Sequence, residues 1–216
     1  MSQREIAYAS FKDALFQEKL VPGQFVTQKE LCELLSVSIS PMRDALKDLE
    51  GENLVEVLAQ TGLRIAHVDK TFIKEAFQMR RFIEIGAVRH VAQSENLDFL
   101  RDVKDKTTSI LKRAESSIDR DLLSEAQEVD MLMHFELIRA LDNSMLTDSH
   151  SRIYERIRLI RLNGRYIPSR LEGALNEHLA VINACLDGDA DRAANQLEHH
   201  FNVAENRALG NGEVVL

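Results

Sequence analysis

The hydrophobic and polar positions at the start of the chain predict two amphipathic helices. The first covers about residues 5–19, and Pro22 with Gly23 follows it as a turn. The second begins at Thr27, because Glu30 stands three residues later and completes a capping box. The positions expected to be buried in these helices are Ile6, Phe11, Leu15, Phe16, Leu31, Leu34 and Leu35.

A third short helix and a change of period follow. The helix has Ser40 as its N-cap and Pro41 at its first helical position, and Gly51 ends it. Beyond it, apolar and polar residues alternate in two segments joined by a turn at 60–62, which predicts a small hairpin. Three short helices and a hairpin, with a tight turn between the second and third helices, are typical of a winged helix-turn-helix. The residues expected to be buried are Ala45, Leu46, Leu49, Val55, Val57, Leu63 and Ile65.

From Asp69 onward the alternating pattern disappears and long helical patterns follow. Asn143 and Pro168 mark two of the breaks between them, and at a third Gly188 pairs a helix stop with Asp189 as the next N-cap. The expected helices cover about 71–94, 97–117, 120–142, 145–166, 171–187 and 189–209. The chain is therefore expected to be mainly α, with a winged helix-turn-helix over 1–68, an antiparallel bundle of six or seven helices over 69–209, and a tail over 210–216.

Composition places the chain among globular proteins. A hydrophobic fraction of 44% in 216 residues is ample for packed cores. No stretch approaches the roughly 20 apolar residues of a membrane helix, and the start lacks the apolar run of a signal peptide, so a cytoplasmic protein is expected. Cys32 and Cys185 lie far apart and form neither a disulfide framework nor a CxxC motif.

The charge of the chain argues against non-specific coating of nucleic acid. The formal net charge is −8, whereas phosphate binding depends on Lys and Arg displacing counterions. Residues 1–67 hold seven Lys or Arg against ten Asp or Glu, a net charge of −3. Any DNA-binding site must therefore be local.

The start of the third predicted helix carries the strongest candidates for DNA contact, because this part of the motif enters the major groove. Arg43 leads them, since a guanidinium bonds bidentately to guanine or phosphate, although it could instead pair with Asp44 or Asp48 on its own helix. Ser40 could bond phosphate or simply cap its helix. The candidates are Lys29, Ser38, Ile39, Ser40, Met42, Arg43 and, at the tip of the wing, Gly62.

Four residues of the helical part have a spacing that suits a metal. Asp130 and His134 lie four residues apart on one expected helix and share a face. His178 and His200 flank the turn at Gly188 and would stand within roughly 3 Å of the same height on antiparallel helices. Three imidazoles and a carboxylate suit a divalent transition metal such as zinc or nickel, with positions left open. The alternatives are ordinary surface histidines, and His199 in place of His200.

The first part of the chain resembles the DNA-binding domain of the GntR family of transcription regulators. The resemblance covers about residues 5–67 and rests on VPGQF at 21–25, ELCELLSVSISPMRDALKDLE at 30–50, NLV at 53–55 and TG at 61–62. It implies DNA contacts from Lys29, Arg43 and Gly62. The family usually has Arg where this chain has Ile39, which predicts weaker binding or a different half-site preference.

The second part resembles the helical ligand-binding domain called FCD, over about residues 72–205. The matching segments are MRRFIE at 79–84, the stretch 128–146 with Asp130 and His134, and the residues around His178, Gly188 and His200. Met133 stands directly before His134, where the family usually has Phe. The resemblance implies a metal on Asp130, His134, His178 and His200, and a small carboxylate effector beside it. Candidate effector contacts are Arg80, Asn143, Arg158 and Arg161, although each Arg could instead pair with a carboxylate of the bundle.

The expected function is therefore a DNA-binding transcription regulator, not an enzyme. It would bind a double-stranded operator as a homodimer, and the carboxylate effector would modulate its affinity. The main alternative is a metal-dependent hydrolytic enzyme, because such a metal site could activate water. The sequence has no HExxH, P-loop, GxGxxG or nucleophile elbow to support it. A helical protein-interaction module is a third possibility.

Overall fold

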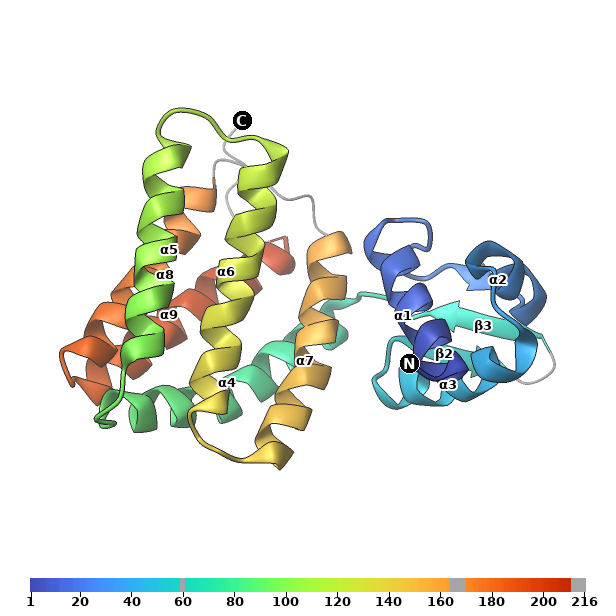
Figure 1. Ribbon diagram of the computed structural model, residues 1–216, viewed down its shortest axis with the longest axis horizontal. Coiled ribbons are helices and arrows are strands. Elements are labelled where there is room, and N and C mark those ends of the chain that lie inside the picture. The colour runs from blue at the N-terminus through green and yellow to red at the C-terminus, as the bar shows by residue number, and fades with distance from the viewer. Residues whose placement is uncertain (59–60, 164–169, 211–216) are drawn as a thin grey trace. The chain divides into compact units, whose positions relative to one another are not determined.

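The computed structural model describes residues 1–58, 61–163 and 170–210, and in this part the protein is mainly α with one small sheet (Figure 1). The described residues form two compact units. The first holds Met1–Ala76 and the part of one helix from residue 152 to 163, and the second holds Phe77–Ser151 and the residues from 170 on. Their boundary falls within two long helices.

The first unit contains the predicted winged helix-turn-helix. Its elements are α1 (Gln3–Phe16), β1 (Phe25–Val26), α2 (Gln28–Leu35), α3 (Ile39–Gly51), β2 (Val55–Leu58) and β3 (Gly62–Ile65). The capping box of α2 is present: Glu30 N donates to Thr27 Oγ1 at 3.2 Å, and Thr27 N donates to Glu30 Oε2 at 2.9 Å. Helix α1 ends at Phe16 rather than near 19, because Glu18 takes a left-handed φ of 59°.

Helix α3 begins two residues earlier than the sequence predicts, at Ile39. Its N-cap is Ser38, so the assignment of Ser40 as N-cap and Pro41 as first helical residue is wrong. Proline is tolerated at the third helical position because the amide hydrogens of the whole first turn lack partners within the helix.

Most of the predicted core positions are buried, Phe11, Leu15 and Leu31 among them. Ile6 and Leu34 are exposed, and Phe16, Leu35 and Val57 are half-buried. The buried face of α1 is formed by Ala7, Phe11, Ala14 and Leu15, and that of the two-turn helix α2 by Leu31 alone.

Met42, a candidate for DNA contact, lies instead in the core of α3 together with Ala45, Leu46 and Leu49, so it cannot serve as a DNA contact.

The sheet has the order β1-β3-β2 and is antiparallel throughout. The predicted hairpin is β2 and β3, with Val57 opposite Leu63. Strand β1, with Val26 opposite Leu63, was not predicted, because two residues are too few to show an alternating pattern. Gln60 of the predicted turn lies outside the described residues.

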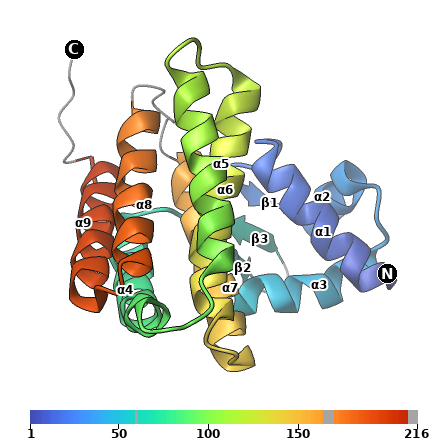
Figure 2. The ribbon, with the colours of Figure 1, turned by 60° about the vertical axis from the view of Figure 1, so that its left-hand side comes forward.

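The six long helices are present, and each described end lies within three residues of its predicted position. They are α4 (Lys70–Ala92), α5 (Asp98–Ala114), α6 (Arg120–Arg139), α7 (Ser144–Asn163), α8 (Leu171–Leu186) and α9 (Ala190–Ala208). In both views α5 lies beside α6 and α8 beside α9 (Figures 1 and 2). Gly188 turns the chain with a φ of 74°, and the side chain of Asp189 caps α9 by accepting from Arg192 N at 2.9 Å.

Two of the predicted helix breaks need comment. Asn143 does not end α6. Its side chain accepts from Leu146 N at 3.2 Å and so caps the start of α7, after Asp142 has turned the backbone with a φ of 46°. Pro168 lies outside the described residues.

Candidate metal centre and DNA-binding surface

The start of α3 presents an exposed polar surface. Ser38, Ser40 and Arg43 are exposed there, beside Ile39. Arg43 does not pair with a carboxylate of its own helix: its Nε donates to Gln28 Oε1 of α2 at 3.2 Å. This contact joins the two helices of the motif and leaves the Arg43 side chain on their outer surface.

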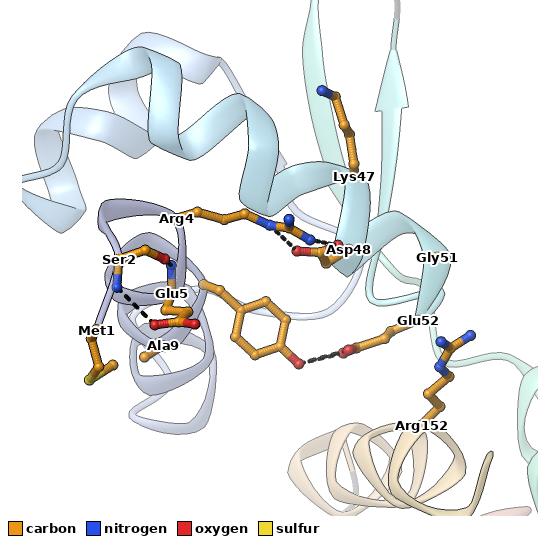
Figure 3. A pocket seen from close by; sticks show the side chains of 11 residues that line it. Met1, Ser2, Arg4, Glu5, Ala9, Lys47, Asp48, Gly51, Glu52 and Arg152 are labelled. Carbon is orange, nitrogen blue, oxygen red and sulfur yellow. Dashed lines mark hydrogen bonds and ion pairs between the residues drawn. The ribbon is translucent and has the colours of Figure 1, made fainter. Parts of the chain in front are cut away.

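The acidic residues further along α3 are engaged within the first unit. Arg4 Nε of α1 donates to Asp48 at 2.7 Å (Figure 3). Tyr8 Oη of α1 lies 2.8 Å from Glu52, the C-cap of α3, and Glu50 accepts from Val57 N at 3.0 Å. These three carboxylates are therefore held against α1 and β2, whereas Asp44, next to Arg43, is exposed and pairs with Lys47.

The two remaining candidates for DNA contact differ: Lys29 is an exposed side chain, whereas Gly62 is buried. Lys29 lies 3.8 Å from Glu33 on its own helix, and both side chains are well exposed. Gly62 is buried and has a φ of 150°, and a Cβ there would come within 2.5 Å of the carbonyl oxygen of Val26. The tight approach of β3 to β1 therefore requires glycine at this position.

In the second unit, Asp130, His134, His178 and His200 come together. Asp130 and His134 come from α6, His178 from α8 and His200 from α9, and one ligand atom from each lies within 4.8 Å of all the others. His178 Nε2 is 3.4 Å from His200 Nε2 and 3.3 Å from Asp130 Oδ1, and His134 Nε2 is 4.0 Å from the same oxygen. His199 is exposed, which decides between the two neighbouring histidines.

Two carboxylates contact the Nδ1 atoms of His134 and His200, on the side of each ring away from the cluster. Glu84 of α4 lies 2.6 Å from Nδ1 of His134, and Glu177 of α8 lies 2.8 Å from Nδ1 of His200. A carboxylate that accepts the Nδ1 proton leaves the Nε2 lone pair of the ring for a metal. Both rings thus present Nε2 to the centre of the cluster.

The state of His134 fits a metal ligand. Burial lowers the pKa of His134 to about 4, and the charge of Arg80 acts in the same direction. The ring is therefore neutral near pH 7, as ligation requires. Among the described residues, no hydrogen-bond partner is found for the buried His134 Nε2. A buried ring nitrogen that faces two imidazoles and a carboxylate is a donor atom suited to a divalent cation.

Of the four candidate effector residues, Arg80 and Asn143 belong to the second unit and Arg158 and Arg161 to the first. Arg80 is 1% exposed and pairs with Glu84, with Nε 2.7 Å from Oε1, so it takes the bundle carboxylate that the sequence left as an alternative. Its guanidinium also lies 4.6 Å from the ring centre of Phe201. Arg158 pairs with Glu155, and Arg161 donates to Tyr154 Oη, both within α7 in the first unit. Asn143 caps α7.

Three residues of the site were not assigned a role from the sequence. Glu84 matches the Glu that is usual on the first helix of the FCD domain, but the resemblance implied no role for it. Glu177 precedes Gly188 by 11 residues and His200 follows it by 12, so the height argument applied to His178 would also have found this pair. His150 of α7, buried with Nε2 3.0 Å from Glu84 Oε1, gave no signal, because a single His in an amphipathic helix carries none.

Comparison with known proteins gives two family matches. The model described as "FCD domain" matches residues 75–203, and that described as "Bacterial regulatory proteins, gntR family" matches residues 3–65. Within the described residues, no helix is both long and apolar enough to span a membrane.

Individual relatives agree with these matches. The Nta operon transcriptional regulator of Aminobacter aminovorans is 29% identical over 143 residues, which cover 65% of this chain and 64% of the relative. A GntR transcriptional regulator of Rhodococcus sp. RHA1 has the same fold, with 17% identity, a TM-score of 0.79 and coverage of 99% and 100%. The Zn²⁺-bound FCD domain of TM0439 is similar in fold with 24% identity and a TM-score of 0.53, covering 68% of this chain and 97% of that domain.

The protonation of His134 predicts a pH dependence for the metal-free protein. The unfolded chain takes up a proton near the usual pKa of 6.5, whereas the folded protein does so only near 4. The contribution of His134 to the free energy of unfolding is therefore fully present above pH 6.5. It falls as the pH drops toward 4, by up to about 3 kcal/mol. Urea unfolding at a series of pH values, after chelator treatment, measures this fall.

The matched variants for this measurement are His134→Asn and His199→Gln. The first removes the titrating ring but keeps a donor for Glu84, so the fall in stability between pH 6.5 and 4 should shrink. The second changes an exposed ring and should leave the fall as in the wild type. An equal fall in the His134→Asn protein would contradict the assignment.

Proposed function

The chain belongs to the GntR family of bacterial regulatory proteins and carries an FCD domain, and on that basis we propose that residues 1–68 bind an operator while residues 69–209 hold a divalent metal and a small carboxylate effector. Its named relatives are transcription regulators, not enzymes, so the hydrolytic interpretation is not retained.

The observation that carries the proposal is the convergence of Asp130, His134, His178 and His200 in a buried place between three helices. One carboxylate oxygen and three imidazole nitrogens are a donor set for zinc, nickel or a similar ion. A bound ion of this class would supply Lewis-acidic positions to which a carboxylate oxygen can bind. The Zn²⁺-bound FCD domain of similar fold supports the choice of metal.

Arg80 supports an anionic effector. It is a buried cation that reaches the cluster through a single residue, since Glu84 contacts both Arg80 and His134. A buried guanidinium is the group that binds a carboxylate most strongly, in a bidentate geometry. A carboxylate effector that reaches Arg80 must compete with Glu84, and that competition would link ligand binding to the packing of α4 and α6.

Regulation requires that the effector bind two states of the protein unequally. An effector that displaces Arg80 from Glu84 would change the buried ion pairs around Glu84, which also include His134 and His150. We propose that their rearrangement changes how the helical part holds the DNA-binding part, and hence the operator affinity.

A homodimer completes the proposal, because helix-turn-helix proteins commonly bind two half-sites. One face of α4 is suited to a second copy: Phe82 is 76% exposed, Met79 is 46% exposed, and nothing lies within 4 Å of a Cβ built on Gly86. A two-fold axis close to Phe82 would bring the same residues of both copies together and bury them.

The metal proposal predicts that the purified protein binds Zn²⁺ and that His178→Ala weakens the binding by more than about 100-fold, because a direct ligand is lost. Competition with a chromophoric chelator measures the affinity. His199→Ala removes an exposed neighbouring imidazole and should bind Zn²⁺ as the wild type does. Equal affinities for wild type and His178→Ala would refute the ligand assignment.

The DNA proposal predicts that Arg43→Ala weakens binding to the upstream region of the protein's own gene. The loss should be about 1–3 kcal/mol, or roughly 5–150-fold, if the guanidinium contacts a base or a phosphate closely. Gel shifts at one fixed salt concentration measure it. Arg101→Ala removes the same charge from an exposed pair on α5 and serves as control. Equal loss in both variants would mean that Arg43 acts only through net charge.

The dimer proposal predicts that Phe82→Glu makes the protein monomeric, because a buried unpaired carboxylate at the two-fold axis would repel its copy. Sedimentation equilibrium gives the mass. Met145→Glu, which changes an equally exposed apolar residue at the start of α7, should remain dimeric. A dimeric Phe82→Glu protein would place the interface elsewhere.

A further inference from the structure

His150 lies beside the metal cluster without belonging to it. It comes from the N-terminal half of α7, whereas the four candidate ligands come from α6, α8 and α9. Its ring is 1% exposed and packs edge-on against Phe135, with 4.9 Å between the ring centres. Its Nε2 lies 3.0 Å from Glu84 Oε1. Buried polar groups are normally hydrogen-bonded, so the contact between the buried His150 ring and the buried Glu84 carboxylate is part of how both groups are satisfied.

Glu84 has more donors than an ordinary ion pair provides. Oε1 accepts from Arg80 Nε at 2.7 Å and from His150 Nε2 at 3.0 Å, and Oε2 accepts from His134 Nδ1 at 2.6 Å. Arg80 and Glu84 thus form a buried ion pair, with Nε 2.7 Å from Oε1, so the carboxylate is paired with a permanent cation. An ionised carboxylate only accepts, so both imidazole nitrogens that face it carry hydrogen.

The division of donors between the two oxygens matters for His134. Arg80 Nη2 lies 3.5 Å from Oε2, so Arg80 reaches the second oxygen only weakly. A guanidinium beside a carboxylate favours the bidentate arrangement, in which it would take both oxygens at short distance. The hydrogen bond from His150 to Oε1 is a second restraint on the oxygen that Arg80 contacts, so the carboxylate is held from α7 as well as from α4 while Oε2 accepts from His134 Nδ1.

We infer that His150 is a positioning residue for the metal centre: it holds the Glu84 carboxylate in the orientation that fixes the ring and the tautomer of His134. The inference rests on the proposed metal site, and it adds α7 to the three helices that supply the ligands. Residues behind the ligands of a metal commonly change its affinity by about 10–100-fold.

Two variants of His150 distinguish a role in holding Glu84 by a hydrogen bond from a role in packing alone. His150→Leu keeps an apolar side chain of moderate size but donates no hydrogen bond. His150→Gln places an amide N–H about where Nε2 stood and can still donate to Glu84. The Zn²⁺ affinity, measured by chelator competition, should fall about 10–100-fold in His150→Leu and return to within a few-fold of wild type in His150→Gln.

A second measurement uses the metal-free proteins. Long-range ¹⁵N–¹H correlation spectra of ¹⁵N-histidine protein report which ring nitrogen is protonated. His134 should carry its hydrogen on Nδ1 in the wild type and in His150→Gln, and should show a mixture of tautomers in His150→Leu. Far-UV circular dichroism confirms that each variant is folded before the comparison is made.

The outcomes distinguish this inference from the function on which it rests. If wild type and His150→Leu bind Zn²⁺ equally, or if His150→Gln binds as weakly as His150→Leu, the role of His150 is refuted while the metal site stands. If the wild type binds no Zn²⁺, the metal site is refuted. The His134 tautomer in the metal-free proteins then decides by itself whether His150 positions the ring, and an unchanged tautomer in His150→Leu would overturn the inference.

Discussion

A fully buried carboxylate controls the helical part of this protein. Glu84 sits inside a bundle where an ionised group is tolerated only if donors surround it, and Arg80, His134 and His150 supply them. Each donor comes at a defined distance and belongs to a defined helix, so α4, α6 and α7 are tied together at one point. The same carboxylate lies 2.6 Å from His134 Nδ1, on the opposite side of the ring from the candidate metal ligand atom Nε2.

The first unit has a net negative charge, yet it presents an exposed polar surface at the start of α3. Asp48 and Glu52 of α3 face α1, where Arg4 and Tyr8 bind them, and the start of α3 is left with its Ser and Arg side chains outward. A net charge of −3 over this part of the sequence therefore says little about the surface that would meet DNA. The position of each charge decides the local field, not the sum.

The sequence was sufficient for the architecture because long periodic helices and turn residues carry strong local signals. The turn at Gly188 and the capping box at Thr27 are examples in which one or two residues fix a boundary. The sequence did not predict β1, because a strand of two residues shows no alternating pattern. It also did not identify the N-cap of α3, because Ser38 and Ser40 are both good N-cap residues. His134 and His178 could be proposed as candidate ligands from spacing, whereas the contact of His150 with Glu84 joins residues 66 apart, and only the packing of helices determines it.

The central claim is that a buried site in the helical part governs the affinity of the other part for DNA. Its most direct test is the fluorescence anisotropy of labelled DNA from the gene's own upstream region, titrated at one salt concentration. The titration is done with metal-free protein, with Zn²⁺-loaded protein, and with Zn²⁺-loaded protein in the presence of a series of small carboxylates. The account predicts that at least one carboxylate changes the affinity by roughly 5–150-fold, and that His178→Ala abolishes the change. Identical affinities under all conditions would contradict it.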